Sequence, residues 1–196
     1  DDNFSIEVGD SVNITGILIT GEGDITLYEN GARINEGSSP LETLKQYNTP
    51  GLVNLTIVHN QTQNYTESSK TWFLNVTDTT PPTPSNPTEY PADPAIFTIG
   101  QDYQFNVTWA NHVAIDTVLV EHNFTGTLDN YSISGNQGSV YFYNYTEIPA
   151  GIYAWSMIAN DTSGNYNQTE QYSYTVFKNS TTTSLYLNSS QDNLTL

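Results

Sequence analysis

Residues 103–109 read Tyr-Gln-Phe-Asn-Val-Thr-Trp, so apolar and polar side chains alternate along the whole stretch. In an extended strand, successive side chains point to opposite faces of the sheet. The four apolar residues therefore share one face and the three polar residues share the other. This pattern predicts a half-buried strand of a β-sandwich.

Further short strands are expected on both sides of this stretch, separated by turn residues. The hairpin signal Asn30-Gly31 lies inside one of them, Gly16 is expected to form a bulge in another, and residues 39–45 are expected to make one helical turn. The strands are predicted at 6–8, 12–20, 25–34, 52–58, 70–76, 97–99, 117–122, 140–145, 152–159 and 172–177. Regular strands without a longer helix are typical of an all-β, immunoglobulin-like sandwich.

Two such domains are expected, because residues 78–94 contain six prolines. Proline fixes φ and donates no backbone hydrogen bond, so this stretch is predicted to be extended, with an edge strand of the following domain from Thr88 onward. The sequence thus divides into a first sandwich (1–78), a proline-rich linker (79–94), a second sandwich (95–178) and a C-terminal linker with one more strand (179–196). Trp72 is expected to be buried in the core of the first sandwich, and Trp109 and Trp155 in the core of the second.

An internal repeat supports two related domains. Residues 51–62 align with residues 151–162, and residues 9–15 align with residues 100–108 after insertion of two residues. Repetition at this spacing is a signature of array proteins.

The net charge is −17, but only 13% of the residues are charged. The cations are Arg33, Lys45, Lys70 and Lys178, so nucleic acid and anionic lipid are not expected as partners. No apolar run is long enough to insert into a membrane, and no cysteine is present. A salt-adapted acidic surface is the alternative explanation of the charge.

Acceptor motifs for N-linked glycans, Asn-x-Ser/Thr, occur three times as often as the roughly five expected by chance. The acceptors are Asn3, Asn13, Asn54, Asn60, Asn64, Asn75, Asn106, Asn123, Asn130, Asn144, Asn160, Asn167, Asn179, Asn188 and Asn193. Several fall on the polar phase of predicted strands, where a glycan would not disturb the core. A densely glycosylated surface is predicted; a composition rich in Asn and Thr without modification is the alternative.

The pattern does not indicate an enzyme. His59, His112 and His122 lie in unrelated segments, and no Gly-x-Ser-x-Gly motif is present. No cofactor and no catalytic or metal-binding residue is therefore predicted. Residues 161–165 (Asp-Thr-Ser-Gly-Asn) favour a tight turn, with a calcium site shared with Asp78 or Asp93 as the alternative. Tyr153 follows Pro149 and Gly151 as in the tyrosine corner of a sandwich, although it can equally be a core residue.

The end of the chain, residues 184–196, has strand alternation but no third domain to join. Its last five residues match residues 2–6 in pattern, which suggests a repeat of about 190 residues. We expect this strand to pair with the first domain of another copy and to supply the contact residues Leu185, Tyr186, Leu187, Leu194 and Leu196. A covalent tandem array and a truncated third domain are the alternatives.

Residues 78–82 (Asp-Thr-Thr-Pro-Pro), the stretch 151–165 and the glycan-acceptor density together resemble the immunoglobulin-like repeats of archaeal cell-surface proteins. Proteins of this kind form surface layers, stalks, threads or pili, in some cases through donor strands. The resemblance implies a structural repeat of an extracellular, N-glycosylated surface filament whose partners are other copies of itself. A carbohydrate-binding or cell-binding adhesin and the stalk of a secreted enzyme are the other hypotheses.

Overall fold

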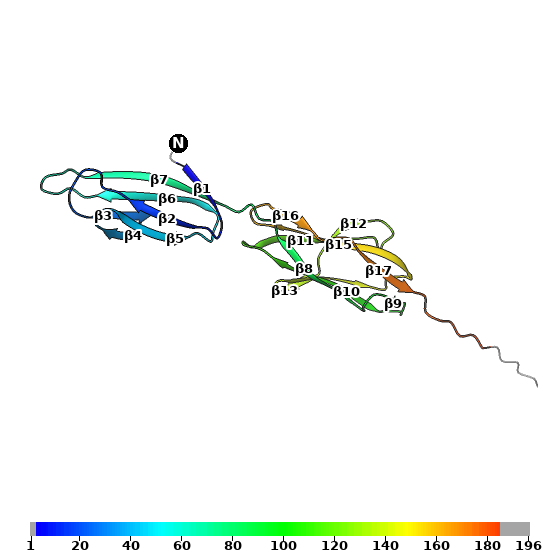
Figure 1. Ribbon diagram of the computed structural model, residues 1–196. Helices are drawn as coiled ribbons and strands as arrows, with labels where there is room; N and C mark the ends of the chain where they lie inside the picture. The colour runs from blue at the N-terminus through cyan, green and yellow to red at the C-terminus, as the bar shows by residue number, and fades with distance from the viewer. Residues whose placement is uncertain (1–2, 185–196) are drawn as a thin grey trace, which may run out of the picture.

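The computed structural model describes residues 3–184, and every regular element in this range is a β-strand. Two β-sandwiches lie end to end, and a short segment after β7 joins them (Figure 1). The predicted all-β architecture of two tandem sandwiches is confirmed. The additional C-terminal strand was predicted in a region that includes residues 185–196, which lie outside the described residues.

The first sandwich pairs a sheet of five strands with a sheet of two. The larger sheet has the order β1-β7-β6-β3-β4, in which β1 runs parallel to β7, and the smaller sheet is β2-β5. The strands are β1 (Asn3–Glu7), β2 (Ser11–Gly16), β3 (Ile25–Glu29), β4 (Ala32–Gly37), β5 (Leu41–Gln46), β6 (Gly51–His59) and β7 (Ser68–Thr77).

The second sandwich pairs the sheet β13-β14-β10-β8 with the sheet β12-β11-β15-β17-β9, and β16 also pairs with β15. The strands are β8 (Thr83–Tyr90), β9 (Ala95–Ile96), β10 (Asp102–Ala110), β11 (Ile115–His122), β12 (Asp129–Ser132), β13 (Gly135–Gln137), β14 (Val140–Thr146), β15 (Gly151–Asp161), β16 (Tyr166–Gln168) and β17 (Tyr172–Phe177).

The internal repeat seen in the sequence has a counterpart in the topology. β6 lies between β7 and β3, and β15 lies between β17 and β11 in the same arrangement. The parallel strand β9 beside β17 likewise corresponds to β1 beside β7. On the same basis β2 corresponds to β10, because residues 9–15 align with residues 100–108.

The local predictions have mixed outcomes. Asn30 and Gly31 both have positive φ between the paired strands β3 and β4, as the hairpin signal predicted. The predicted helical turn at residues 39–45 is wrong, because residues 41–46 form β5 and pair with β2. Here the long-range pairing with β2 overrides the weak local signal of a helix start.

The predicted bulge at Gly16 is also wrong. Gly16 ends β2 in regular register with Leu41, and the predicted strand does not continue to residue 20. A Cβ atom at this position would lie 2.2 Å from Cδ1 of Ile57, so a larger residue would force the Ile57 side chain to move.

The proline-rich segment enters the second sheet earlier than predicted. β8 begins at Thr83 and not at Thr88, so half of the expected linker is paired with β10. Asn86 has a φ of +50°, and the register shifts by one residue opposite Asn106 and Thr108. This bulge accommodates Pro87. Because β8 is an edge strand, its prolines do not have to donate backbone hydrogen bonds to a strand on the other side.

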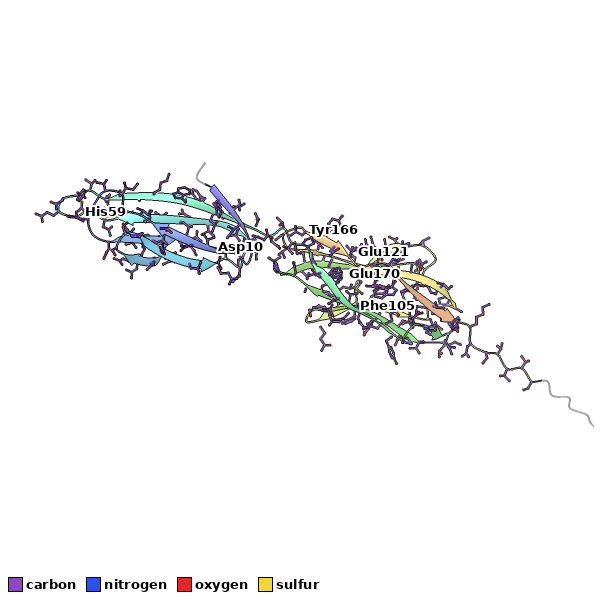
Figure 2. The ribbon with its side chains drawn as sticks, viewed as in Figure 1. Asp10, His59, Phe105, Glu121, Tyr166 and Glu170 are labelled. Carbon is purple, nitrogen blue, oxygen red and sulfur yellow. The ribbon has the colours of Figure 1, made fainter. Side chains whose placement is uncertain are left out.

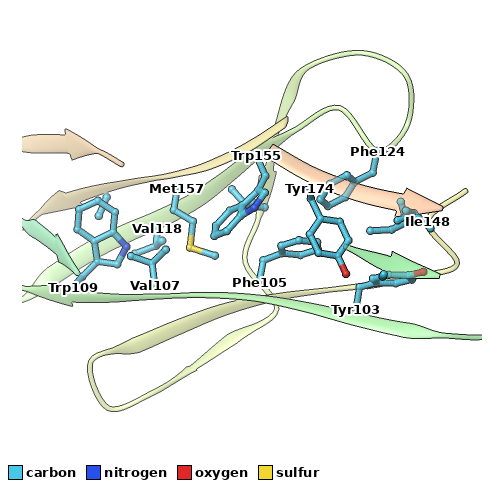
Figure 3. Close-up of a cluster of buried hydrophobic side chains, with 14 residues drawn as sticks. Tyr103, Phe105, Val107, Trp109, Val118, Phe124, Ile148, Trp155, Met157 and Tyr174 are labelled. Atoms are coloured by element: carbon cyan, nitrogen blue, oxygen red, sulfur yellow. The ribbon is translucent and has the colours of Figure 1, made fainter. Parts of the chain in front are cut away.

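The second sandwich has a continuous aromatic core, shown in Figure 3. Trp109 and Trp155 are buried as predicted, with exposed fractions of 1% and 0%. Trp72, which was predicted to fill the first core, is 49% exposed, so that prediction is wrong. Tyr153 donates a hydrogen bond of 2.8 Å to the carbonyl of Pro149, which confirms the tyrosine corner.

Side-chain amides join the two sandwiches. Asn165 Nδ2 donates to the carbonyl oxygen of Asp78, and Asn167 Nδ2 donates to that of Pro82, each at 2.9 Å. Val113 of the second sandwich packs against the first core. These contacts give the junction both polar and apolar support.

Candidate functional site

The small sheet β2-β5 of the first sandwich has an edge at β2 that no described strand covers. In the second sandwich, β10 has two neighbours, β14 and β8. Its counterpart β2 is paired only with β5 among residues 3–184. The backbone groups on the other edge of β2 thus have no strand partner there, a condition that favours strand addition.

Across the sandwich from this edge lies β7 of the large sheet, and only half of the length of β7 is paired on both sides. β1 pairs with β7 only from Phe73 to Thr77. Along the preceding part of β7, from Ser68 to Trp72, β6 is the only described strand that pairs with β7, so the other edge of this part is unpaired. The sandwich is therefore open between β2 and the first half of β7.

A groove of about 690 Å³ occupies this opening. Apolar side chains from both sheets line most of it: Phe4, Val12, Ile14, Ile17, Ile19, Leu27, Leu55, Ile57, Trp72, Phe73 and Leu74. Ile19 is 93% exposed and Ile17 is 64% exposed, although both are large aliphatic residues. Contiguous exposed apolar surface is uncommon in folded proteins and is typical of interaction sites.

Trp72 lines the floor of the groove. It lies on the same face of β7 as Leu74 and Val76, which are core residues with 2% exposure. Trp72 therefore points into the sandwich and is exposed because no described strand covers it. The prediction about Trp72 was correct about the phase of β7 and wrong about what lies above it.

Polar groups mark the rim of the groove. The Lys70 ammonium group lies 5.7 Å from the centre of the Trp72 ring, a cation–π contact. Asn13, one of the predicted glycan acceptors, contributes to the lining from β2 and has an exposed side chain. The groove thus combines an apolar floor with a polar border.

The sequence did not identify this groove. It predicted an incomplete edge in the first domain, but the edge beside β7 is partly filled by β1, and the groove lies along the edge of β2. A comparison of the two repeats gives a signal for it, because β2 aligns with β10, and the second neighbour of β10 is β8 from residues 83–90. The predicted contact residues Leu185, Tyr186, Leu187, Leu194 and Leu196 lie outside the described residues.

The predicted glycan acceptors within the described side chains are distributed over both sandwiches and are exposed or half-buried. The exposed ones are Asn13, Asn60, Asn64, Asn75, Asn130, Asn144 and Asn179, and the half-buried ones are Asn54, Asn106, Asn123, Asn160 and Asn167. The side chains of Asn3, Asn188 and Asn193 are not described. Occupancy of these positions stays a prediction.

The histidines considered in the sequence are dispersed. His59 lies near the end of the first sandwich that is remote from the second (Figure 2), and its Nε2 contacts the carbonyl of Glu22. His122 is buried in the second core, where it stacks between Phe124 and Tyr131 with both ring centres at 4.2 Å. Burial lowers the pKa of His122 to about 4.

The Asp161 turn has the geometry of the predicted tight turn. Its Oδ1 accepts hydrogen bonds from the backbone N–H groups of Ser163 and Asn165, and its Oδ2 accepts them from the amides of Asn111 and Asn165. Burial alone would raise the pKa of Asp161, but these hydrogen bonds outweigh it and lower the pKa. Four protein donors thus satisfy the carboxylate that the calcium hypothesis required.

Comparisons with known proteins support the fold. No family model matches the sequence, and no curated protein matches it. Among solved structures, the amphioxus IgVJ-C2 molecule is 14% identical with a TM-score of 0.50, over 87% of this chain and 99% of that chain. At this identity, the likeness supports the tandem immunoglobulin-like fold and nothing further.

Two other solved structures are less similar. An ICAM-5 D1–D4 ectodomain fragment is 12% identical with a TM-score of 0.46, over 89% of this chain and 51% of that chain. The fibronectin(III)-like modules of Clostridium thermocellum CbhA are 15% identical with a TM-score of 0.37, over 90% of each chain. Within residues 3–184, no helix is long and apolar enough to cross a membrane.

Proposed function

We propose that this chain is the structural repeat of an extracellular, N-glycosylated surface filament or array, and that a strand from another copy fills the groove of the first sandwich. The groove between β2 and β7 carries this proposal, because it joins an unpaired strand edge to an exposed apolar floor. An added strand satisfies both at once, since its backbone pairs with the edge and its alternate side chains cover the floor.

The second sandwich supports a particular segment as the added strand. There, β8 begins at Thr83 and β9 at Ala95, twelve residues later. In the first sandwich the strand equivalent to β9 is β1, which begins at Asn3. If Asn193 is matched to Asn3, as the pattern of the last five residues indicates, the strand equivalent to β8 begins twelve residues earlier, at Thr181.

This correspondence assigns different roles to the leucines at the end of the chain. Residues 181–188 correspond to β8, so Leu187 corresponds to Glu89, which points into the second core and bonds Trp155. Leu185 lies on the same side of an extended strand as Leu187. Leu194 and Leu196 correspond to Phe4 and Ile6, which belong to β1. The position beside β7 that Leu194 and Leu196 would occupy is therefore already filled by β1.

The proposal is tested by variants on the two partners. Deletion of residues 184–196 should abolish assembly, measured by light scattering and electron microscopy. Ile19→Asp should do the same from the groove side, because Ile19 lines the groove and is 93% exposed, so the fold tolerates the change. Ile99→Asp is the matched control, since Ile99 is 82% exposed in the second sandwich and should leave assembly intact. Assembly that survives both the deletion and Ile19→Asp refutes the proposal.

A covalent tandem array would use the same groove within one long chain. Electrophoresis of native material under denaturing conditions separates the two arrangements. A filament of individual copies yields a single small subunit, whereas a covalent array remains one long polypeptide.

The adhesin hypothesis is supported by one observation, the aromatic residues Phe4, Trp72 and Phe73 in the groove. Aromatic rings in a concave site can bind sugars, but the glycan acceptor Asn13 borders this groove. A sugar-array titration of the chain that lacks residues 184–196 tests this alternative. Saturable binding that Trp72→Ala removes would favour the adhesin.

A further inference from the structure

Three side chains form a row across the outer face of the sheet β14-β10-β8. In the strand register, Gln104 of β10 lies opposite Asn144 of β14 on one side and opposite Tyr90 of β8 on the other. The neighbouring residues Tyr103 and Phe105 of β10 are buried in the core, so the row faces outward.

The row borders a shallow hollow of about 390 Å³, lined by Tyr90, Asp102, Tyr103, Gln104 and Asn144. Tyr90 is 66% exposed there. The hollow thus presents an exposed aromatic ring on one side, a glycan acceptor on the other, and a carboxylate and an amide as hydrogen-bonding groups.

The amide of Asn144 is oriented by its neighbour. Gln104 Nε2 donates a hydrogen bond of 3.0 Å to Asn144 Oδ1. Glycosylation takes place at the amide nitrogen. The hydrogen bond from Gln104 therefore orients the Asn144 side chain through Oδ1 and leaves Nδ2 for the glycan. At Asn106, on the same face, the amide nitrogen itself donates to Thr88 Oγ1 at 3.0 Å.

We propose that an N-glycan on Asn144 crosses Gln104 and packs the apolar face of one of its sugar rings on Tyr90. Asn144 and Tyr90 are separated by two strand spacings, about 10 Å, which the first sugars of a glycan span. The C–H groups of a pyranose face are attracted to the negative face of the tyrosine ring. Asp102 accepts hydrogen bonds from sugar hydroxyl groups, and Gln104 both accepts and donates them.

This contact has a structural consequence for β8. The strand lies at the edge of its sheet, and among the described strands it pairs only with β10. A glycan that starts on β14 and ends on β8 ties together the two strands that flank β10, and it covers an aromatic ring that is otherwise exposed to water. The inference rests on the glycosylation part of the proposed function and is independent of filament assembly.

The test is a cycle of four proteins expressed in a host that glycosylates Asn-x-Ser/Thr: the wild type, Tyr90→Ala, Asn144→Gln and the double variant. Glycopeptide mass spectrometry first establishes that Asn144 carries a glycan in the wild type. Tyr90→Ala should then lower the Tm by about 3 °C more when Asn144 is glycosylated than in the Asn144→Gln background. As a control, removal of a glycan from the first sandwich by Asn54→Gln should not change the effect of Tyr90→Ala.

A second measurement detects the contact directly. In NMR spectra, sugar protons above the Tyr90 ring should shift upfield, and the shift should disappear in Tyr90→Ala. Equal Tm losses in both backgrounds, unshifted sugar protons, or an Asn144 that carries no glycan each overturn the inference. None of these results affects the assembly test, which depends on the groove of the first sandwich.

Discussion

Trp155 Nε1 donates a hydrogen bond of 2.7 Å to Glu89 Oε1, so a fully buried indole of the second core is bonded to the edge strand β8. Burial raises the pKa of Glu89, the hydrogen bond from Trp155 lowers it, and the negative charge of Asp93 raises it further, with a net increase. β8 is the strand that the first sandwich lacks among its described residues. In the second sandwich, the hydrogen bond between Trp155 and Glu89 attaches this strand to the core.

Glu89→Gln should stabilise the protein at neutral pH. A carboxyl group whose folded pKa lies above its unfolded value of 4.5 loses stabilisation as the pH rises from that value through the folded pKa. Glutamine retains an oxygen that accepts the Trp155 hydrogen bond and carries no charge. We expect a higher Tm for the variant at about pH 7 and a smaller difference at about pH 4. A lower Tm at both pH values would contradict this reasoning.

Truncation of the three tryptophans should destabilise the second sandwich more than the first. Trp109→Ala and Trp155→Ala should each cost about 3 to 5 kcal/mol of unfolding free energy, because both side chains are fully buried. Trp72→Ala should cost roughly 1 kcal/mol in the isolated chain, because half of its surface already contacts water. Urea denaturation measures all three. An equal loss for Trp72 would show that its site is covered in solution.

Acid should destabilise the second sandwich through His122. The folded pKa of about 4 lies below the ordinary value of 6.5, so the unfolded chain takes up a proton that the folded chain excludes. The contribution of His122 is thus fully present above 6.5 and is lost as the pH falls toward 4. Urea midpoints of the wild type should fall over this window. His122→Gln should have a lower stability at neutral pH and a flatter pH dependence.

The leucines at the end of the chain should differ in their effect on the groove. A synthetic peptide of residues 179–196 should bind the chain that lacks residues 184–196 and shift the Trp72 fluorescence to shorter wavelength, since Trp109 and Trp155 are already buried. Leu185→Asn with Leu187→Asn should abolish the shift. Leu194→Asn with Leu196→Asn should leave it nearly unchanged, because β1 occupies the corresponding place on β7. The reverse order of effects would overturn the proposed register.

Glycans should occupy most of the acceptor positions in native material. The described acceptor side chains are exposed or half-buried, so a folded chain presents them to solvent. Glycopeptide mass spectrometry measures occupancy at each position. Occupancy of fewer than about a third of them would favour the alternative that the excess reflects composition.

The sequence by itself determined the strands with clear alternation, because side-chain alternation is a local property of an extended backbone. The phase of β10, the hairpin at Asn30-Gly31 and the corner at Tyr153 were all predictable for this reason. Each depends on a few consecutive residues. The same locality explains the correct inward phase of Trp72.

Only the tertiary structure decided what covers each face and edge. Residues 41–46 became a strand because β2 lies beside them, and Thr83 joined the sheet because a bulge at Asn86 accommodates the prolines. Trp72 stays half-exposed because the strand that covers the equivalent region of the second sandwich has no counterpart among the described residues of the first. Burial depends on contacts between segments far apart in the chain, which local periodicity does not encode.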